Sequence, residues 1–99
     1  MIELTDATFA TETATGRVLV DFYAPWCGVC KMIKPTLENL TGVKVCALDV
    51  DKYPKTALKL GITNLPTLVL YEGGKPVMRG SFDVIKKLEE VNEKEKTSL

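Results

Sequence analysis

The chain has 99 residues, which is enough for one domain with a single hydrophobic core and too few for two. Apolar residues make up 45% and charged residues 26% of the chain, a balance typical of globular proteins that excludes a disordered or disulfide-dense chain. Thirteen basic residues match thirteen acidic ones without a long block of either sign, which argues against binding to nucleic acid. We therefore expect a single domain over residues 1–99.

The start of the chain lacks the features of a secretory leader. It has no basic segment followed by a long apolar run, and no apolar stretch elsewhere approaches the length of a membrane span. We expect a cytoplasmic protein that works without a membrane. Structural disulfides do not persist in that compartment, so closely spaced cysteines there favour catalysis or metal binding.

Turn residues divide the chain into predicted helices and strands. In the first half these are a helix at 7–10 capped by Thr5 or Asp6, a strand at 18–23, a helix from about Cys27 to Gly42 with Pro35 inside it, and a strand at 43–50. In the second half they are a helix at 54–60, a strand at 67–71, a Gly73-Gly74 hairpin turn, a strand at 76–79 and a helix with the apolar stripe Val84, Leu88 and Val91.

This order of elements, β-α-β followed by β-β-α, predicts an α/β fold. Its core is a mixed sheet of four to five strands with helices on both faces. The segment that follows the strand at 18–23 then lies at the carboxyl end of a central strand, where sheets of this class place their functional sites.

The most informative segment is Trp26-Cys27-Gly28-Val29-Cys30, directly after that strand. Two cysteines three residues apart at the start of a helix lie on one face, close enough to form a small-ring disulfide. The first N–H groups of the helix have no intrahelical partners and can stabilise a thiolate at Cys27. This spacing predicts a redox-active dithiol.

A zinc site is the main alternative for this pair of cysteines. Structural zinc takes four ligands, but the chain has no histidine and only one further cysteine, Cys46. The ligand count disfavours metal. Cys46 lies within an apolar strand, so we interpret it as an inert core residue.

Several separate segments resemble thioredoxin, in the same order and over nearly the whole chain. They are the run from Val20 to Lys31 that contains the dithiol, Pro35, Leu65-Pro66-Thr67, the Gly73-Gly74 turn and Gly80. The resemblance implies a thioredoxin fold and a protein-disulfide reductase with no bound cofactor other than its own Cys27–Cys30 disulfide. It further implies disulfide-containing protein substrates, recharging by an NADPH-dependent thioredoxin reductase, and a monomer.

The resemblance also implies roles for individual residues. Cys27 would be the nucleophile and Cys30 the resolving thiol, with Asp21 relaying protons beneath them. Pro66 would be a cis-proline that pairs with an extended substrate, whereas the residues alone favour a trans-proline at the start of a strand. The substrate-binding residues implied are Trp26, Gly28, Val29, Leu65, Pro66 and Gly80.

Two departures from the family pattern change the expected chemistry. Val29 stands where the common form has proline, and we expect it to make the protein somewhat more oxidising. Ala47 stands where relatives often carry a lysine beside the buried acid, so we expect Asp21 to be unpaired, with a raised pKa. A partner-docking module with an incidental dithiol stays an alternative, although an adaptor would not need all of Cys27, Cys30 and Asp21.

Overall fold

The computed structural model describes the backbone of residues 1–97 and the side chains of residues 1–90. Within this range the chain folds into a five-stranded mixed sheet flanked by helices, as predicted. The strands, in their order across the sheet, are β1 (Ile2–Glu3), β3 (Lys44–Asp49), β2 (Arg17–Tyr23), β4 (Thr67–Glu72) and β5 (Lys75–Gly80). The helices are α1 (Phe9–Thr13), α2 (Gly28–Glu38), α3 (Pro54–Lys59) and α4 (Phe82–Thr97).

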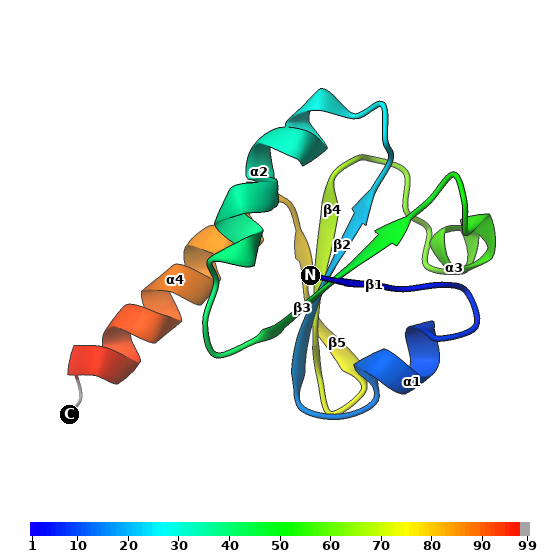
Figure 1. Cartoon of the computed structure of the whole chain (residues 1–99). Helices are drawn as coiled ribbons and strands as arrows, with labels where there is room; N and C mark the ends of the chain where they lie inside the picture. Colours follow the sequence, from blue (N-terminus) through cyan, green and yellow to red (C-terminus); the bar gives the residue numbers. More distant parts are fainter. Residues whose placement is uncertain (98–99) are drawn as a thin grey trace.

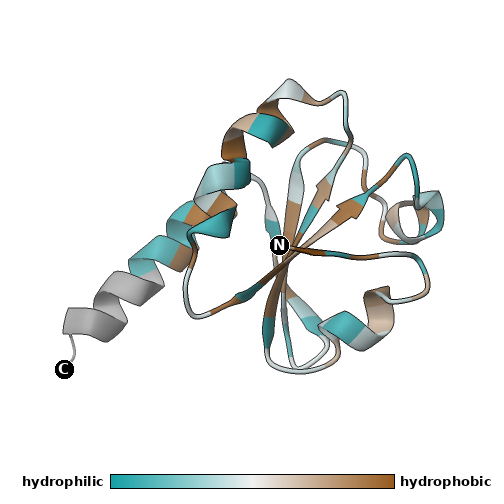
Figure 2. Ribbon diagram, in the orientation of Figure 1, coloured by the Kyte–Doolittle hydropathy of each residue, from teal (hydrophilic) through white to brown (hydrophobic). Residues whose placement is uncertain are grey.

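Helices cover both faces of the sheet, with α2 and α4 on one side and α1 and α3 on the other (Figure 1). Side chains alternate along β2, so that Val20 and Phe22 belong to the α1/α3 core while Leu19 belongs to the α2/α4 core. The central strands β2 and β4 are therefore buried over most of their length, whereas hydrophilic residues are frequent along the helices (Figure 2). This two-sided burial is typical of an α/β sheet.

The strand directions bring three loops to one edge of the sheet. Strands β1, β2 and β3 are parallel, and β4 runs antiparallel to β2 with Thr67 opposite Phe22. Strand β5 runs antiparallel to β4 and ends with Gly80 opposite Leu68. The segment after β2, the segment before β4 and the end of β5 consequently meet at this edge.

The structure corrects three details of the predicted elements. Strand β1 was not predicted, because two residues are too short to show an alternating pattern. The first helix is Phe9–Thr13 instead of 7–10. Of the two predicted caps, Thr5 accepts hydrogen bonds from the N–H groups of Ala7 and Thr8 in the turn before the helix, whereas Asp6 accepts from the N–H and hydroxyl of Thr56. The dithiol helix ends at Glu38, before Gly42.

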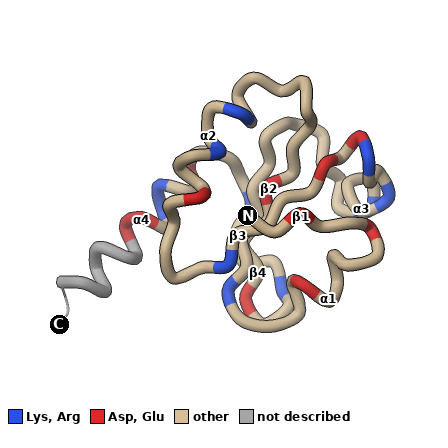
Figure 3. Tube along the Cα trace, viewed as in Figure 1, with Lys and Arg blue, Asp and Glu red and all other residues tan. Residues whose placement is uncertain are grey.

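The remaining helices and strands agree with the prediction within about a residue at each end. In α4, Val84 and Leu88 are buried as expected, while Val91 lies outside the residues whose side chains are described. No helix in residues 1–97 is both long and apolar enough to span a membrane. Basic and acidic residues are interspersed along the chain trace (Figure 3).

Candidate active site

The two cysteines of the Cys27-Gly28-Val29-Cys30 segment form a disulfide, with their Cα atoms 5.3 Å apart. Cys27 is the N-cap of α2, and its Sγ accepts a hydrogen bond from the Cys30 N–H at 3.2 Å. This N–H is one of the donors that the first turn of a helix leaves without a backbone partner. A thiolate at Cys27 would keep this bond and gain from the positive end of the helix.

The disulfide is packed in a small apolar cluster at the edge of the sheet. Cys27 and Cys30 are only 7% and 4% exposed, and they contact Ala24, with Val50 and Leu65 packed against them. The residues around the disulfide are open to solvent: Trp26 is 70%, Val29 44% and Met32 78% exposed. The reactive sulfurs thus lie beneath an apolar surface that another protein can contact.

The loop before β4 lies beside the disulfide, as the strand directions require. The Leu65–Pro66 peptide bond is cis, as the resemblance implied, and Leu65 contacts the cysteine cluster. Pro66 and Gly80 line a common pocket of about 290 Å³ together with Arg79. The structure therefore brings Leu65, Pro66 and Gly80 to the edge of the sheet that carries the disulfide.

Gly28 and Trp26 lie on the exposed side of the dithiol segment. Gly28 is the first residue of α2, and nothing lies within 4 Å of the position that a Cβ would take there. Trp26 is held by a hydrogen bond from its Nε1 to Oδ2 of Asp51, at 2.7 Å. Asp51 was not predicted as a site residue, and nothing in the sequence marks it as a partner of Trp26.

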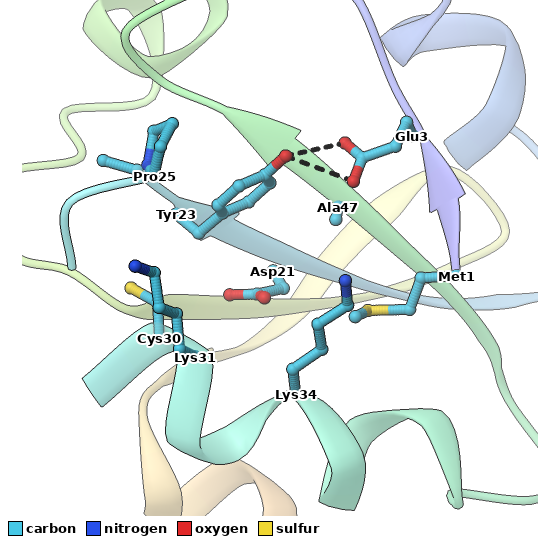
Figure 4. Close-up of a pocket in the computed structure, with 10 residues that line it drawn as sticks. Met1, Glu3, Asp21, Tyr23, Pro25, Cys30, Lys31, Lys34 and Ala47 are labelled. Carbon is cyan, nitrogen blue, oxygen red and sulfur yellow. Dashed lines mark hydrogen bonds between the residues drawn. The ribbon is translucent and has the colours of Figure 1, made fainter. Parts of the chain in front are cut away.

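Asp21 lies inside a pocket of about 390 Å³ that Cys30 also lines (Figure 4). The residue is 3% exposed, and among the described residues Oδ1 has no hydrogen-bond partner. Burial raises the pKa of Asp21 to about 7, the negative charge of Glu3 adds to this shift, and Lys34 opposes it. The structure thus agrees with the prediction of an unpaired acid with a raised pKa.

Ala47 is the neighbour of Asp21 on β3, as the comparison with the family pattern predicted. Three other residues that line the same pocket, Glu3, Tyr23 and Lys34, were not among the predicted site residues. The Tyr23 hydroxyl donates to the Glu3 carboxylate, whose oxygens lie 3.1 and 3.0 Å away. Lys34 could have been found from the sequence, because it follows Cys30 by four residues and shares its helix face. Glu3 could not, because β1 was not recognised.

The third cysteine takes no part in this region. Cys46 is a free thiol with no exposed surface, and burial raises its pKa. A search of the described residues finds no group of three or more His, Cys, Asp or Glu side chains that could hold a metal ion. The redox-active group that the structure does show is the Cys27–Cys30 disulfide.

Comparison with known proteins identifies the family. A family model described as thioredoxin matches residues 1–96. The thioredoxin of Mycobacterium bovis is 46% identical over 85 residues, which cover 79% of this chain and 73% of that protein. The thioredoxins of Bacillus subtilis and Staphylococcus epidermidis are 44% and 43% identical over 82 residues, covering 78% of this chain and 79% of each relative. With such identity over more than three-quarters of its length, the chain belongs to the thioredoxin family of thiol–disulfide oxidoreductases.

Proposed function

We propose that this protein works as a reductant of disulfides in other proteins, with Cys27 as the nucleophile and Cys30 as the resolving thiol. The observation that carries the assignment is the hydrogen bond from the Cys30 N–H to the Cys27 Sγ at the start of α2. It favours a thiolate on Cys27, which is the form that attacks a disulfide. Cys30 lies one turn inside the helix and is not the N-cap, so its sulfur lacks the N-terminal position that stabilises a thiolate at Cys27.

The reaction takes place in two exchanges. The Cys27 thiolate attacks one sulfur of the substrate disulfide, forms a mixed disulfide and releases the other substrate sulfur as a thiolate, which takes a proton from water. Cys30 then gives its proton to the Asp21 carboxylate, and its thiolate attacks the Cys27 sulfur. The Cys27–Cys30 disulfide forms, and the second substrate sulfur leaves as a thiolate.

Asp21 suits the role of the base because of its burial beside Cys30. Both residues line one pocket, so a proton can pass between them directly or through a water molecule. A pKa of about 7 allows Asp21 to accept and release a proton near neutral pH, where a carboxylate with an ordinary pKa would be a weak base.

The surface around the disulfide supports binding of an extended segment of the substrate. Leu65 and Pro66 precede β4 at this edge, and Gly80 ends β5 beside them. Trp26 and Val29 are exposed next to the sulfurs and offer apolar contact area. We assign substrate binding to Trp26, Gly28, Val29, Leu65, Pro66 and Gly80.

The catalytic cycle needs an external reductant, and we propose an NADPH-dependent thioredoxin reductase as its source. Each cycle leaves Cys27 and Cys30 oxidised to the disulfide, so a separate donor must return two electrons before the next cycle. We further propose that residues 1–99 form one domain, that it acts as a monomer, and that it works in the cytoplasm, where protein thiols are kept reduced.

Reduction of insulin by dithiothreitol, followed by its precipitation, tests the proposed function. We expect the protein to accelerate this reaction and the Cys27→Ser variant to be inactive, while Cys46→Ala, the matched control, keeps full activity. Equilibration with glutathione then measures the reduction potential, which decides the direction of the reaction, because a reductant has a low potential and forms its disulfide at a more reducing glutathione ratio than an oxidant does. A protein that fails to accelerate insulin reduction, or that oxidises thiols under these conditions, would contradict the proposal.

A further inference from the structure

Glu3, Ala47 and Asp21 form a row across three neighbouring strands. Glu3 on β1 pairs with Ala47 on β3, and Ala47 pairs in turn with Asp21 on β2. Paired residues of adjacent strands present their side chains on the same face, and adjacent strands lie about 4.8 Å apart. The two acidic residues therefore start about 10 Å apart, with only the methyl group of Ala47 between them.

The carboxylate of Glu3 is held in this row. Both of its oxygens lie within hydrogen-bond distance of the Tyr23 hydroxyl, at 3.1 and 3.0 Å. Tyr23 follows Asp21 by two residues on the same strand, so it shares the face of the sheet on which Asp21 lies. The negative charge of Glu3 is thus fixed on the rim of the pocket that contains Asp21, as Figure 4 shows.

Lys34 brings the opposite charge to the same pocket. It lies on α2, four residues after Cys30, and its side chain extends from the helix toward the strands (Figure 4). The titratable groups that line the pocket around Asp21 belong to Met1, through its α-amino group, Glu3, Tyr23, Cys30, Lys31 and Lys34. Among them, Glu3 and Lys34 act on the Asp21 charge with opposite signs.

We propose that Glu3 is a positioning residue that assists the deprotonation of Cys30 by making Asp21 a stronger base. Lys34 has the opposite effect on Asp21. A fixed negative charge disfavours a second one nearby, so Glu3 favours the protonated form of Asp21. Lys34 favours the ionised form for the converse reason. This inference rests on the proposed role of Asp21 as the base, and it assigns to Glu3 no contact with the substrate.

A direct test follows the carboxyl carbon of Asp21 by NMR while the pH is changed, in the full chain with its disulfide formed. We expect Glu3→Gln to lower the midpoint by about 0.3 to 1.2 pH units, the range for unit charges separated by the strand spacing of about 10 Å at effective dielectric constants from 80 to about 20. Lys34→Met should raise it. The matched controls on α4, Glu90→Gln and Lys86→Met, remove the same charges from residues that do not line the pocket, and should leave the midpoint unchanged.

A kinetic measurement distinguishes this role from a merely structural one, because a structural role would not shift the pH dependence of the rate. The rate at which Cys30 resolves a preformed mixed disulfide, measured against pH by rapid quenching, should change with the midpoint of Asp21. In Glu3→Gln the pH profile of this step should move to lower pH, in the same direction as the NMR titration. The plateau rate at pH values above the midpoint should fall, because Asp21 is then a weaker base.

An unchanged or raised Asp21 midpoint in Glu3→Gln would overturn the inference. If removal of the Glu3 charge disturbs β1, Tyr23→Phe replaces it as the test, because it keeps the charge but releases the carboxylate toward solvent. That variant should lower the midpoint by less than Glu3→Gln is expected to, and no change there would equally overturn the inference. The titration needs no substrate, so a wild-type protein inactive on insulin would contradict the proposed function without affecting this result.

Discussion

The Asp21→Asn variant should be more stable than the wild type at alkaline pH and should lose this advantage in acid. Burial raises the pKa of Asp21 from 3.8 to about 7, so the folded protein binds this proton more tightly than the unfolded chain does. Ionisation of Asp21 therefore lowers the free energy of unfolding progressively between about pH 4 and 7. At 1.36 kcal/mol per pH unit, this cost reaches about 4 kcal/mol.

Asparagine removes the ionisation but leaves a buried polar side chain. An amide without hydrogen-bond partners costs about 1 to 3 kcal/mol, which offsets part of the gain. We therefore expect Asp21→Asn to raise the free energy of unfolding by about 1 to 3 kcal/mol at about pH 8 and to match or fall below the wild type at about pH 4. The variant should also resolve mixed disulfides more slowly at neutral pH, because Cys30 loses its base.

Urea unfolding of the oxidised proteins at a series of pH values measures this difference. Glu90→Gln, which removes an exposed carboxylate from α4, is the control and should leave the difference from wild type nearly independent of pH. Parallel stability curves for the wild type and Asp21→Asn would refute the reasoning. They would mean that Asp21 has the same proton affinity in the folded and unfolded chains.

Two further predictions concern other described residues. Gly80→Ala should lower the free energy of unfolding by about 0.5 to 2 kcal/mol, because a Cβ would lie 2.5 Å from the Asp83 Oδ1 that accepts the Ser81 N–H at the start of α4. In Gly28→Ala, where the Cβ meets open space, urea unfolding should detect no loss, and equal stability of both alanine variants would contradict the packing argument. In the reduced protein, alkylation between about pH 6 and 8 should report the active-site nucleophile, because Cys46 is buried and has a raised pKa. Replacing Cys46 by alanine should leave that profile unchanged, and its disappearance would show that the wrong thiol had been named.

The elements that position the dithiol were predictable because local patterns specify them. The run at 18–23 is apolar in the sequence apart from Asp21, and its residues 18–22 are buried in the sheet. A pair of cysteines after such a strand, at the start of a helix, has few structural alternatives. The cis peptide bond at Pro66 came from the family resemblance, since the residues alone favour a trans bond.

Some of the residues that surround Asp21 could not be predicted from local sequence patterns, because tertiary contacts bring them together. Glu3 reaches the pocket because β1 is the neighbour of β3, and a strand of two residues leaves no periodic signal. Asp6 is a second example, because its carboxylate accepts hydrogen bonds from Thr56, fifty residues further along the chain. Local propensity made Asp6 one of two candidate helix caps, and for this residue a tertiary contact prevailed.

The assignment of nucleophile and resolving thiol is tested most directly by trapping the mixed disulfide. The Cys30→Ser variant, reduced and mixed with a protein disulfide, should accumulate a covalent adduct that mass spectrometry maps to Cys27, because the second exchange cannot follow. Cys27→Ser should form no such adduct, with Cys46 replaced by alanine in both proteins so that the remaining thiol is unambiguous. An adduct through Cys30 in the Cys27→Ser protein, and none in Cys30→Ser, would reverse the two roles and contradict the account.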